Sequence, residues 1–143
     1  MKAIICQLGL MAILVGLVEL SQAHTSKELE EMAKKIGAEC VKQSGIGADE
    51  TKLIMADDLE KIDENKFTDK MKCYMLCFYQ KIGIVDADGK PKVAPLIAFM
   101  EERYDHKKDK VKPAVTKCGS IKEANQCELV FKFERCIAQT IEG

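Results

Sequence analysis

The spacing of six cysteines constrains the fold of this chain more than any other feature. The six are Cys40, Cys73, Cys77, Cys118, Cys127 and Cys136. Their spacing reads C-x32-C-x3-C-x40-C-x8-C-x8-C. An even number of cysteines in a small secreted chain indicates a disulfide framework. We therefore expect the cysteines to decide which helices or strands lie next to each other.

A seventh cysteine, Cys6, lies in an N-terminal segment that has the pattern of a secretory signal peptide. An apolar stretch from Ala3 to Leu20 is followed by Ser21-Gln22-Ala23. Small residues thus occupy the third and the first positions before the expected cleavage site, which follows Ala23. A transmembrane helix is the alternative, but the apolar stretch is of marginal length for one and is interrupted by glycines. Cleavage leaves residues 24–143 as one secreted, extracellular domain with an even number of cysteines.

The charges of the chain exclude several classes of partner. Lysine and arginine number 22 and aspartate and glutamate 23, with the two signs interspersed. No basic patch matches a nucleic-acid backbone, and no acidic tail is present. After the leader, no apolar run approaches the length that spans a membrane. We expect no nucleic-acid or membrane partner for the mature chain.

Apolar periodicity and capping residues predict an all-α domain of about six helices. No segment alternates apolar and polar residues long enough to indicate a strand. A turn of helix is also expected around Leu59, and Pro113 is expected in the first turn of its helix, where proline is tolerated. The predicted helices run from Thr25 to Gly45, Asp49 to Ala56, Thr68 to Gly83, Val93 to Tyr104, Asp109 to Cys118 and Asn125 to Ile141.

Helix geometry limits the disulfide pairing without fixing it. Six cysteines allow 15 pairings. Cys73 and Cys77 project from one face of a helix, and Cys127 and Cys136 are about 13.5 Å apart if they share a helix, so neither pair can bond. These exclusions leave ten pairings. Nine residues are two and a half helical turns, so Cys127 and Cys136 face opposite sides and connect the last helix to two neighbours.

The chain resembles the insect odorant-binding proteins of the pheromone-binding and general odorant-binding family. The resemblance covers the mature chain, with its leader, its length and its cysteine gaps of x3 and a final x8. It is closest in the stretch Lys72-Cys73-Tyr74-Met75-Leu76-Cys77 and in the turn from Lys81 to Lys90.

The resemblance implies a pairing, a fold and a function. It implies the bridges Cys40–Cys77, Cys73–Cys127 and Cys118–Cys136, in six helices around an apolar cavity. The cavity of such proteins holds small volatile or lipid-like molecules, and no cofactor is implied. The expected partners are a small hydrophobic ligand (an odorant, a pheromone or a fatty-acid-like molecule) and a chemosensory receptor. The expected state is a monomer or a weak homodimer.

Candidate ligand-binding residues are the apolar residues on the helix faces that carry the bridges. Methionines suit a cavity for ligands of several shapes, and the Tyr74 hydroxyl offers one polar contact. Phe131 and Phe133 are two apart, so we expect only one to face inward. Ordinary core packing is the alternative for every one of these residues, because periodicity reports burial and not ligand contact. The candidates are Met71, Tyr74, Met75, Phe78, Leu96, Phe99, Met100, Val111, Val115 and Phe131.

Metal and catalytic sites are not expected. Only Cys73 and Cys77 have a spacing near that of structural zinc ligands, and no second close pair accompanies them. The Asp-rich turn ending at Gly89 would place Ile84 and Pro95 at obligatory calcium-ligand positions. Neither histidine of the mature chain lies in a nucleophile motif, so an enzyme is the least favoured class.

Three functions remain. The leading hypothesis is a secreted carrier that delivers odorants or pheromones to chemosensory receptors. The second is the same scaffold carrying lipids or other apolar ligands in a fluid unconnected with smell. The third is a secreted effector whose surface binds another protein, which a solid core without ligand binding would favour.

Overall fold

The computed structural model describes residues 26–56 and 58–143. The predicted leader and the Thr25 cap lie outside these residues. Contacts divide the chain into residues 1–32 and residues 33–143. The arrangement described below is that of the second part.

The described residues form an all-α fold, as the sequence predicts. Their one β pairing is an isolated bridge between Val85 and Pro91. None of their helices combines the length and apolar character needed to cross a membrane. The elements are α1 (Ser26–Ser44), α2 (Ala48–Ile54), η1 (Leu59–Lys61), η2 (Glu64–Lys66), α3 (Asp69–Lys81), α4 (Val93–Arg103), η3 (Asp105–Lys107), α5 (Lys108–Cys118) and α6 (Gln126–Glu142).

The helix ends follow local signals in the sequence. Gly45 ends α1 with a φ of 70°, a conformation that glycine adopts without a steric penalty. The Thr68 hydroxyl accepts from the backbone N–H of Met71 and caps α3. The Asn125 side chain accepts from the backbone N–H groups of Cys127 and Glu128 and caps α6. Each cap satisfies donors that a helix start leaves without an intrahelical partner.

The position of Pro113 within its helix differs from the prediction. α5 begins at Lys108, so Pro113 lies in its second turn and not in its first. The expectation for Pro113 was therefore wrong. A proline there removes the hydrogen bond to the carbonyl four residues earlier, that of Asp109. Asp109 is exposed, so water can satisfy that carbonyl and the cost of the proline is reduced.

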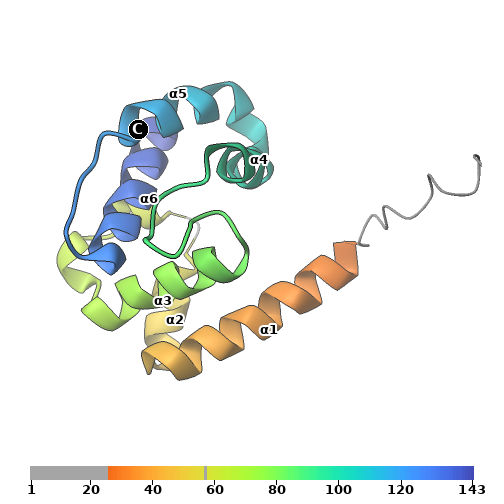
Figure 1. The fold of residues 1–143 in the computed structure, drawn as a ribbon, viewed down its shortest axis with the longest axis vertical. Helices are drawn as coiled ribbons and strands as arrows, with labels where there is room; N and C mark the ends of the chain where they lie inside the picture. Colours follow the sequence, from red (N-terminus) through yellow and green to blue (C-terminus); the bar gives the residue numbers. More distant parts are fainter. Residues whose placement is uncertain (1–25, 57) are drawn as a thin grey trace, which may run out of the picture. The chain divides into compact units, whose positions relative to one another are not determined.

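Helix α6 packs against both α3 and α5, which lie on different sides of it (Figure 1). Helix α4 packs on α5, α2 packs on α3, and η1 packs on α6. Both Phe131 and Phe133 of α6 are buried, which corrects the expectation that only one faces inward. Two side chains that are two residues apart can both be buried because α6 has neighbours on more than one side.

Three disulfides connect these helices. Cys40–Cys77 joins α1 to α3, Cys73–Cys127 joins α3 to α6, and Cys118–Cys136 joins α5 to α6. This is the pairing that the resemblance implies. Cys127 and Cys136 connect α6 to two different helices, as the spacing of nine residues predicts.

Candidate ligand-binding site

A cavity of about 250 Å³ lies between α2, η1, α3, α4 and α6. Eight of the lining residues are apolar or aromatic, and an arginine and a glutamate complete the wall. Ligand pockets in proteins usually combine mainly apolar walls with a few polar groups that orient the ligand. The lining residues are Ile54, Met55, Leu59, Tyr74, Met75, Phe78, Tyr79, Phe99, Arg103 and Glu134.

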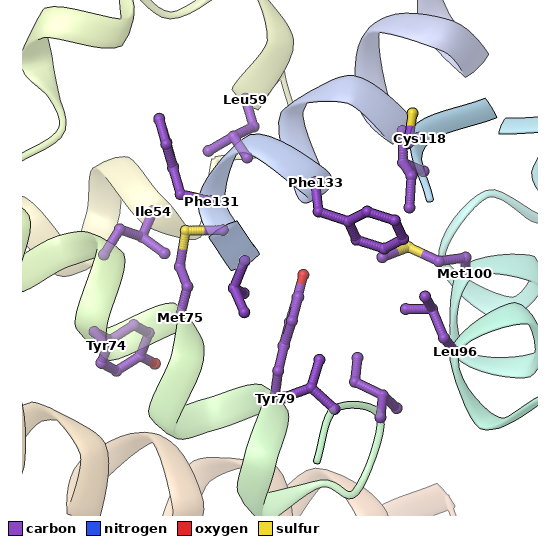
Figure 2. Close-up of a cluster of buried hydrophobic side chains, with 14 of the residues drawn as sticks. Ile54, Leu59, Tyr74, Met75, Tyr79, Leu96, Met100, Cys118, Phe131 and Phe133 are labelled. Atoms are coloured by element: carbon purple, nitrogen blue, oxygen red, sulfur yellow. The ribbon is translucent and has the colours of Figure 1, made fainter. Parts of the chain in front are cut away.

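Aromatic rings form a continuous part of the wall. Tyr74 and Phe78 are one helical turn apart on α3, with ring centroids 6.3 Å apart. Phe78 lies 6.4 Å from Tyr79, and Tyr79 meets Phe99 of α4 edge to face at 5.9 Å. Figure 2 shows Tyr74, Met75 and Tyr79 projecting from α3, with the Tyr79 hydroxyl directed among the buried side chains. Rigid rings offer apolar area at a low cost in side-chain entropy.

The side chain of Met55 marks the mouth of the cavity. Met55 follows the last residue of α2 and is 63% exposed, although it also lines the cavity. The neighbouring lining residues Ile54 and Leu59 are buried. A flexible thioether at the opening can move aside for an entering ligand at little cost.

The polar end of the cavity is formed by Glu134, Arg103 and Tyr79. Glu134 is fully buried, and its Oε1 accepts a hydrogen bond of 2.5 Å from the Arg103 guanidinium. The same guanidinium donates to the Tyr79 hydroxyl at 3.5 Å. The second carboxylate oxygen, Oε2, is buried and has no hydrogen-bond partner among the described residues. A buried polar atom without a partner is rare and costly.

The tyrosines around this pair stay neutral over a wide pH range. Burial raises the pKa of Tyr79 well above its ordinary value, and the charge of Glu134 acts in the same direction. Burial, followed by the charge of Glu134, raises the pKa of Tyr104 to about 12. Burial acts to lower the pKa of Arg103, but the charge of Glu134, aided by both tyrosines, raises it overall. The polar end therefore presents a charged pair beside a neutral phenol.

Four of the ten sequence-predicted ligand-binding residues line this cavity. They are Tyr74, Met75, Phe78 and Phe99. The structure places the other six in the buried core and not on the cavity wall. These six are Met71, Leu96, Met100, Val111, Val115 and Phe131.

The sequence reasoning missed the polar end of the cavity and its mouth. Glu134 follows Val130 by four residues and Phe131 by three, so it occupies a position on the apolar face of α6. This charged residue on an apolar helix face was the signal that could have revealed the polar end of the cavity. A buried charge requires a partner, so its position predicts a polar group nearby. No comparable signal marks Met55, whose exposure depends on how the chain leaves α2.

Within residues 26–56 and 58–143, no group of three or more histidine, cysteine, aspartate or glutamate side chains is placed to hold a metal ion. The six described cysteines are all in disulfides.

Comparison with models of protein families shows to which family the chain belongs. Residues 22–140 match the model of the PBP/GOBP family. The chain belongs to the PBP/GOBP family. Membership implies a carrier of small hydrophobic ligands, and the cavity agrees with that implication.

Individual members of the PBP/GOBP family align along most of the chain. General odorant-binding protein 56a of Drosophila melanogaster is 26% identical over 129 residues, which cover 90% of this chain and 87% of that protein. The fatty acid binding protein OBP56a from the oral disk of the blowfly Phormia regina has a similar structure, with a TM-score of 0.62 and 30% identity. That match covers 82% of this chain and 95% of the blowfly chain. OBP28a of Drosophila melanogaster, at 19% identity and a TM-score of 0.63, shares the fold.

Proposed function

We propose that this protein is a secreted carrier that binds small hydrophobic molecules in the cavity and delivers them to chemosensory receptors. The proposed ligands are odorants or pheromones. The observation that supports the proposal is the cavity of about 250 Å³, lined mainly by apolar and aromatic side chains, in a chain of the PBP/GOBP family. The proposed mature protein begins at His24 and acts as a monomer or a weak homodimer.

The size and walls of the cavity favour a small ligand held by burial of apolar surface. Its volume is just below the common range for ligand pockets, about 300–1,000 Å³. Removing apolar surface from water contributes about 25 cal/mol per Å². The rings of Phe78 and Phe99 both lie next to the ring of Tyr79 in the wall, so an extended hydrocarbon chain would contact several rings at once.

The disulfides support a cavity that exists before the ligand arrives. Two of the three bridges connect α3, which supplies four lining residues, to α1 and α6. A bridge stabilises the folded state mainly by restricting the unfolded chain, typically by about 2–4 kcal/mol. The framework is therefore expected to keep the domain folded, with α3 covalently joined to α1 and α6, before a ligand binds.

A second function is transport of lipids or other apolar ligands outside the olfactory system. The blowfly structure similar to this chain is named a fatty acid binding protein and comes from the oral disk. The same cavity physics applies to both functions. The tissue and fluid in which the protein accumulates distinguish them.

The proposal is tested with the oxidised protein recovered from the medium of insect cells that express the full chain. Sequencing of its N-terminus checks cleavage before His24. Titration with N-phenyl-1-naphthylamine, a fluorophore that brightens in apolar surroundings, is expected to give saturable micromolar binding. Small alcohols, esters or fatty acids are expected to displace it, and reduction of the disulfides is expected to abolish binding.

The contrary result is a folded, oxidised protein that binds no fluorophore saturably. The cavity would then be closed to ligands, and a secreted effector that binds another protein would become the better account. Retention of the chain inside the cells would contradict the secretion part of the proposal alone.

A further inference from the structure

The wall of the cavity contains a buried carboxylate with one oxygen that lacks a donor. Glu134 has no exposed surface. Its Oε1 is satisfied by Arg103 at 2.5 Å, whereas Oε2 has no partner among the described residues. An ionised oxygen without a hydrogen bond costs more than a neutral one, because charge is poorly solvated in a protein interior.

The neighbouring protein groups leave this oxygen available. The Tyr79 hydroxyl lies close to the pair, where it accepts a long contact of 3.5 Å from the Arg103 guanidinium, but it forms no hydrogen bond with Oε2 in this structure. Burial keeps bulk water away from Oε2, so a donor has to come from the contents of the cavity. The last side-chain torsion of glutamate is soft, and a small rotation turns Oε2 further towards the cavity.

We infer that the cavity selects neutral ligands that carry a hydroxyl group, with Glu134 accepting the hydrogen bond from that hydroxyl. The inference deepens the proposed carrier function and rests on it. Arg103 already balances the charge of Glu134, so a neutral head group completes the site. The hydrocarbon tail would then extend past Phe78 and Phe99 towards Met55 at the mouth.

The same geometry disfavours charged head groups at this end. An ionised carboxylate would lie beside the like charge of Glu134, and the guanidinium it needs is already bound. An ammonium group would add a second positive charge beside Arg103. Burial keeps the pKa of Tyr79 high, so its hydroxyl stays protonated and can donate to the oxygen of an alcohol.

The test compares ligands of equal size in displacement of N-phenyl-1-naphthylamine from the oxidised protein at neutral pH. 1-Octanol donates and accepts a hydrogen bond, whereas heptyl methyl ether has the same atoms but only accepts. We expect 1-octanol to bind at least about tenfold more tightly than the ether, which corresponds to ~1.4 kcal/mol. We also expect octanoate and protonated octylamine to bind more weakly than 1-octanol.

Glu134→Gln and Glu128→Gln form a matched pair of variants on α6. Gln at 134 keeps one oxygen for Arg103 and replaces the unpaired acceptor with a donor, so the preference for the alcohol should fall to within about twofold. Glu128 pairs with Lys72 and does not line the cavity, so its variant should keep the preference. Circular dichroism measures whether each variant is folded. If Glu134→Gln is unfolded, the comparison of 1-octanol with the ether in the wild-type protein tests the inference on its own.

The outcomes separate this inference from the function on which it rests. Saturable fluorophore binding with equal affinity for the alcohol and the ether would overturn the inference and leave the carrier function standing. Tightest binding of octanoate or octylammonium, or an unchanged preference in Glu134→Gln, would also overturn it. Absence of any fluorophore binding would overturn both.

Discussion

The Arg103 guanidinium donates a 2.5 Å hydrogen bond to Oε1 of Glu134 and so connects α4 to α6 at the polar end of the cavity. The two partners differ in their access to water. The Glu134 side chain is 0% exposed, whereas that of Arg103 is 31% exposed. Water can therefore partly solvate Arg103 when it is alone, whereas the Glu134 carboxylate has no surface exposed to solvent.

This difference predicts unequal losses of stability. Arg103→Met leaves an uncompensated buried charge and should lower the free energy of unfolding by about 3 kcal/mol, near the lower end of the range for broken buried pairs. Glu134→Gln keeps an acceptor and leaves a partly exposed cation, so its cost should be about 1 kcal/mol. Urea denaturation at neutral pH measures both.

Lys81→Met provides the control for this comparison. Lys81 pairs with Glu39 at 2.9 Å, but both side chains are exposed. Removing such a surface pair should change stability by less than about 1 kcal/mol. Equal losses for Arg103→Met and Glu134→Gln would contradict the assignment of Glu134 as the partner that depends on the pair.

The three tyrosines of the chain should resist ionisation in alkaline solution. Burial is the main cause that raises the pKa of Tyr74, of Tyr79 and of Tyr104 above the ordinary value of 10. The folded state thus retains phenolic protons that the unfolded state releases. Stability from this source is intact below about pH 10 and declines as the pH rises above it.

Ultraviolet absorbance of tyrosinate measures this directly. At pH 10 the folded protein should show far less than half of its tyrosine side chains ionised, rising to about half after unfolding in urea, because unfolded tyrosines have a pKa of about 10. The Tyr104→Phe variant should lose the component that titrates near pH 12. Half ionisation at pH 10 in the folded protein would mean that these hydroxyls are in contact with water.

Two glycines with positive φ allow the energetic cost of backbone strain to be measured separately from that of steric crowding. Gly45 has a φ of 70° and open space at the position of a Cβ. Gly89 has a φ of 76°, but a Cβ there would lie 3.3 Å from Cβ of Gln126 and 3.4 Å from Leu76. Gly45→Ala should cost about 1–2 kcal/mol from strain alone. Gly89→Ala should cost at least about 1 kcal/mol more, because a neighbour must also move.

Thermal and urea unfolding of the two variants test the comparison. The wild-type protein is the reference, and identical slopes in urea would show that the unfolded states are alike. Equal losses would show that the contact between the turn at Gly89 and the start of α6 is loose.

The helices could be predicted from the sequence because their signals are local. Thr68, Asn125 and Gly45 act within one helical turn, and the apolar period of α6 is strong enough to locate it to within one or two residues. Pro113 shows the limit of local reasoning. Its tolerance depends on whether one carbonyl reaches water, which the fold decides.

The cavity wall could not be predicted residue by residue. Met71 and Met75 are one turn apart on the same face of α3, and both are buried, yet only Met75 lines the cavity. Which of them faces a void depends on the angle at which α3 crosses its neighbours. Sequence period reports that a side chain is buried but carries no information about that angle.

A single tryptophan in the cavity wall tests most directly whether ligands occupy this cavity. The chain has no natural tryptophan, so the emission of Phe99→Trp would report on the wall alone. Val93→Trp, on an exposed position of the same helix, is the control. We predict that 1-octanol shifts the emission of Phe99→Trp saturably, with the affinity found by fluorophore displacement, and leaves that of Val93→Trp unchanged. Displacement of the fluorophore without any change in the Phe99→Trp emission would contradict this account, because binding would then take place elsewhere on the protein.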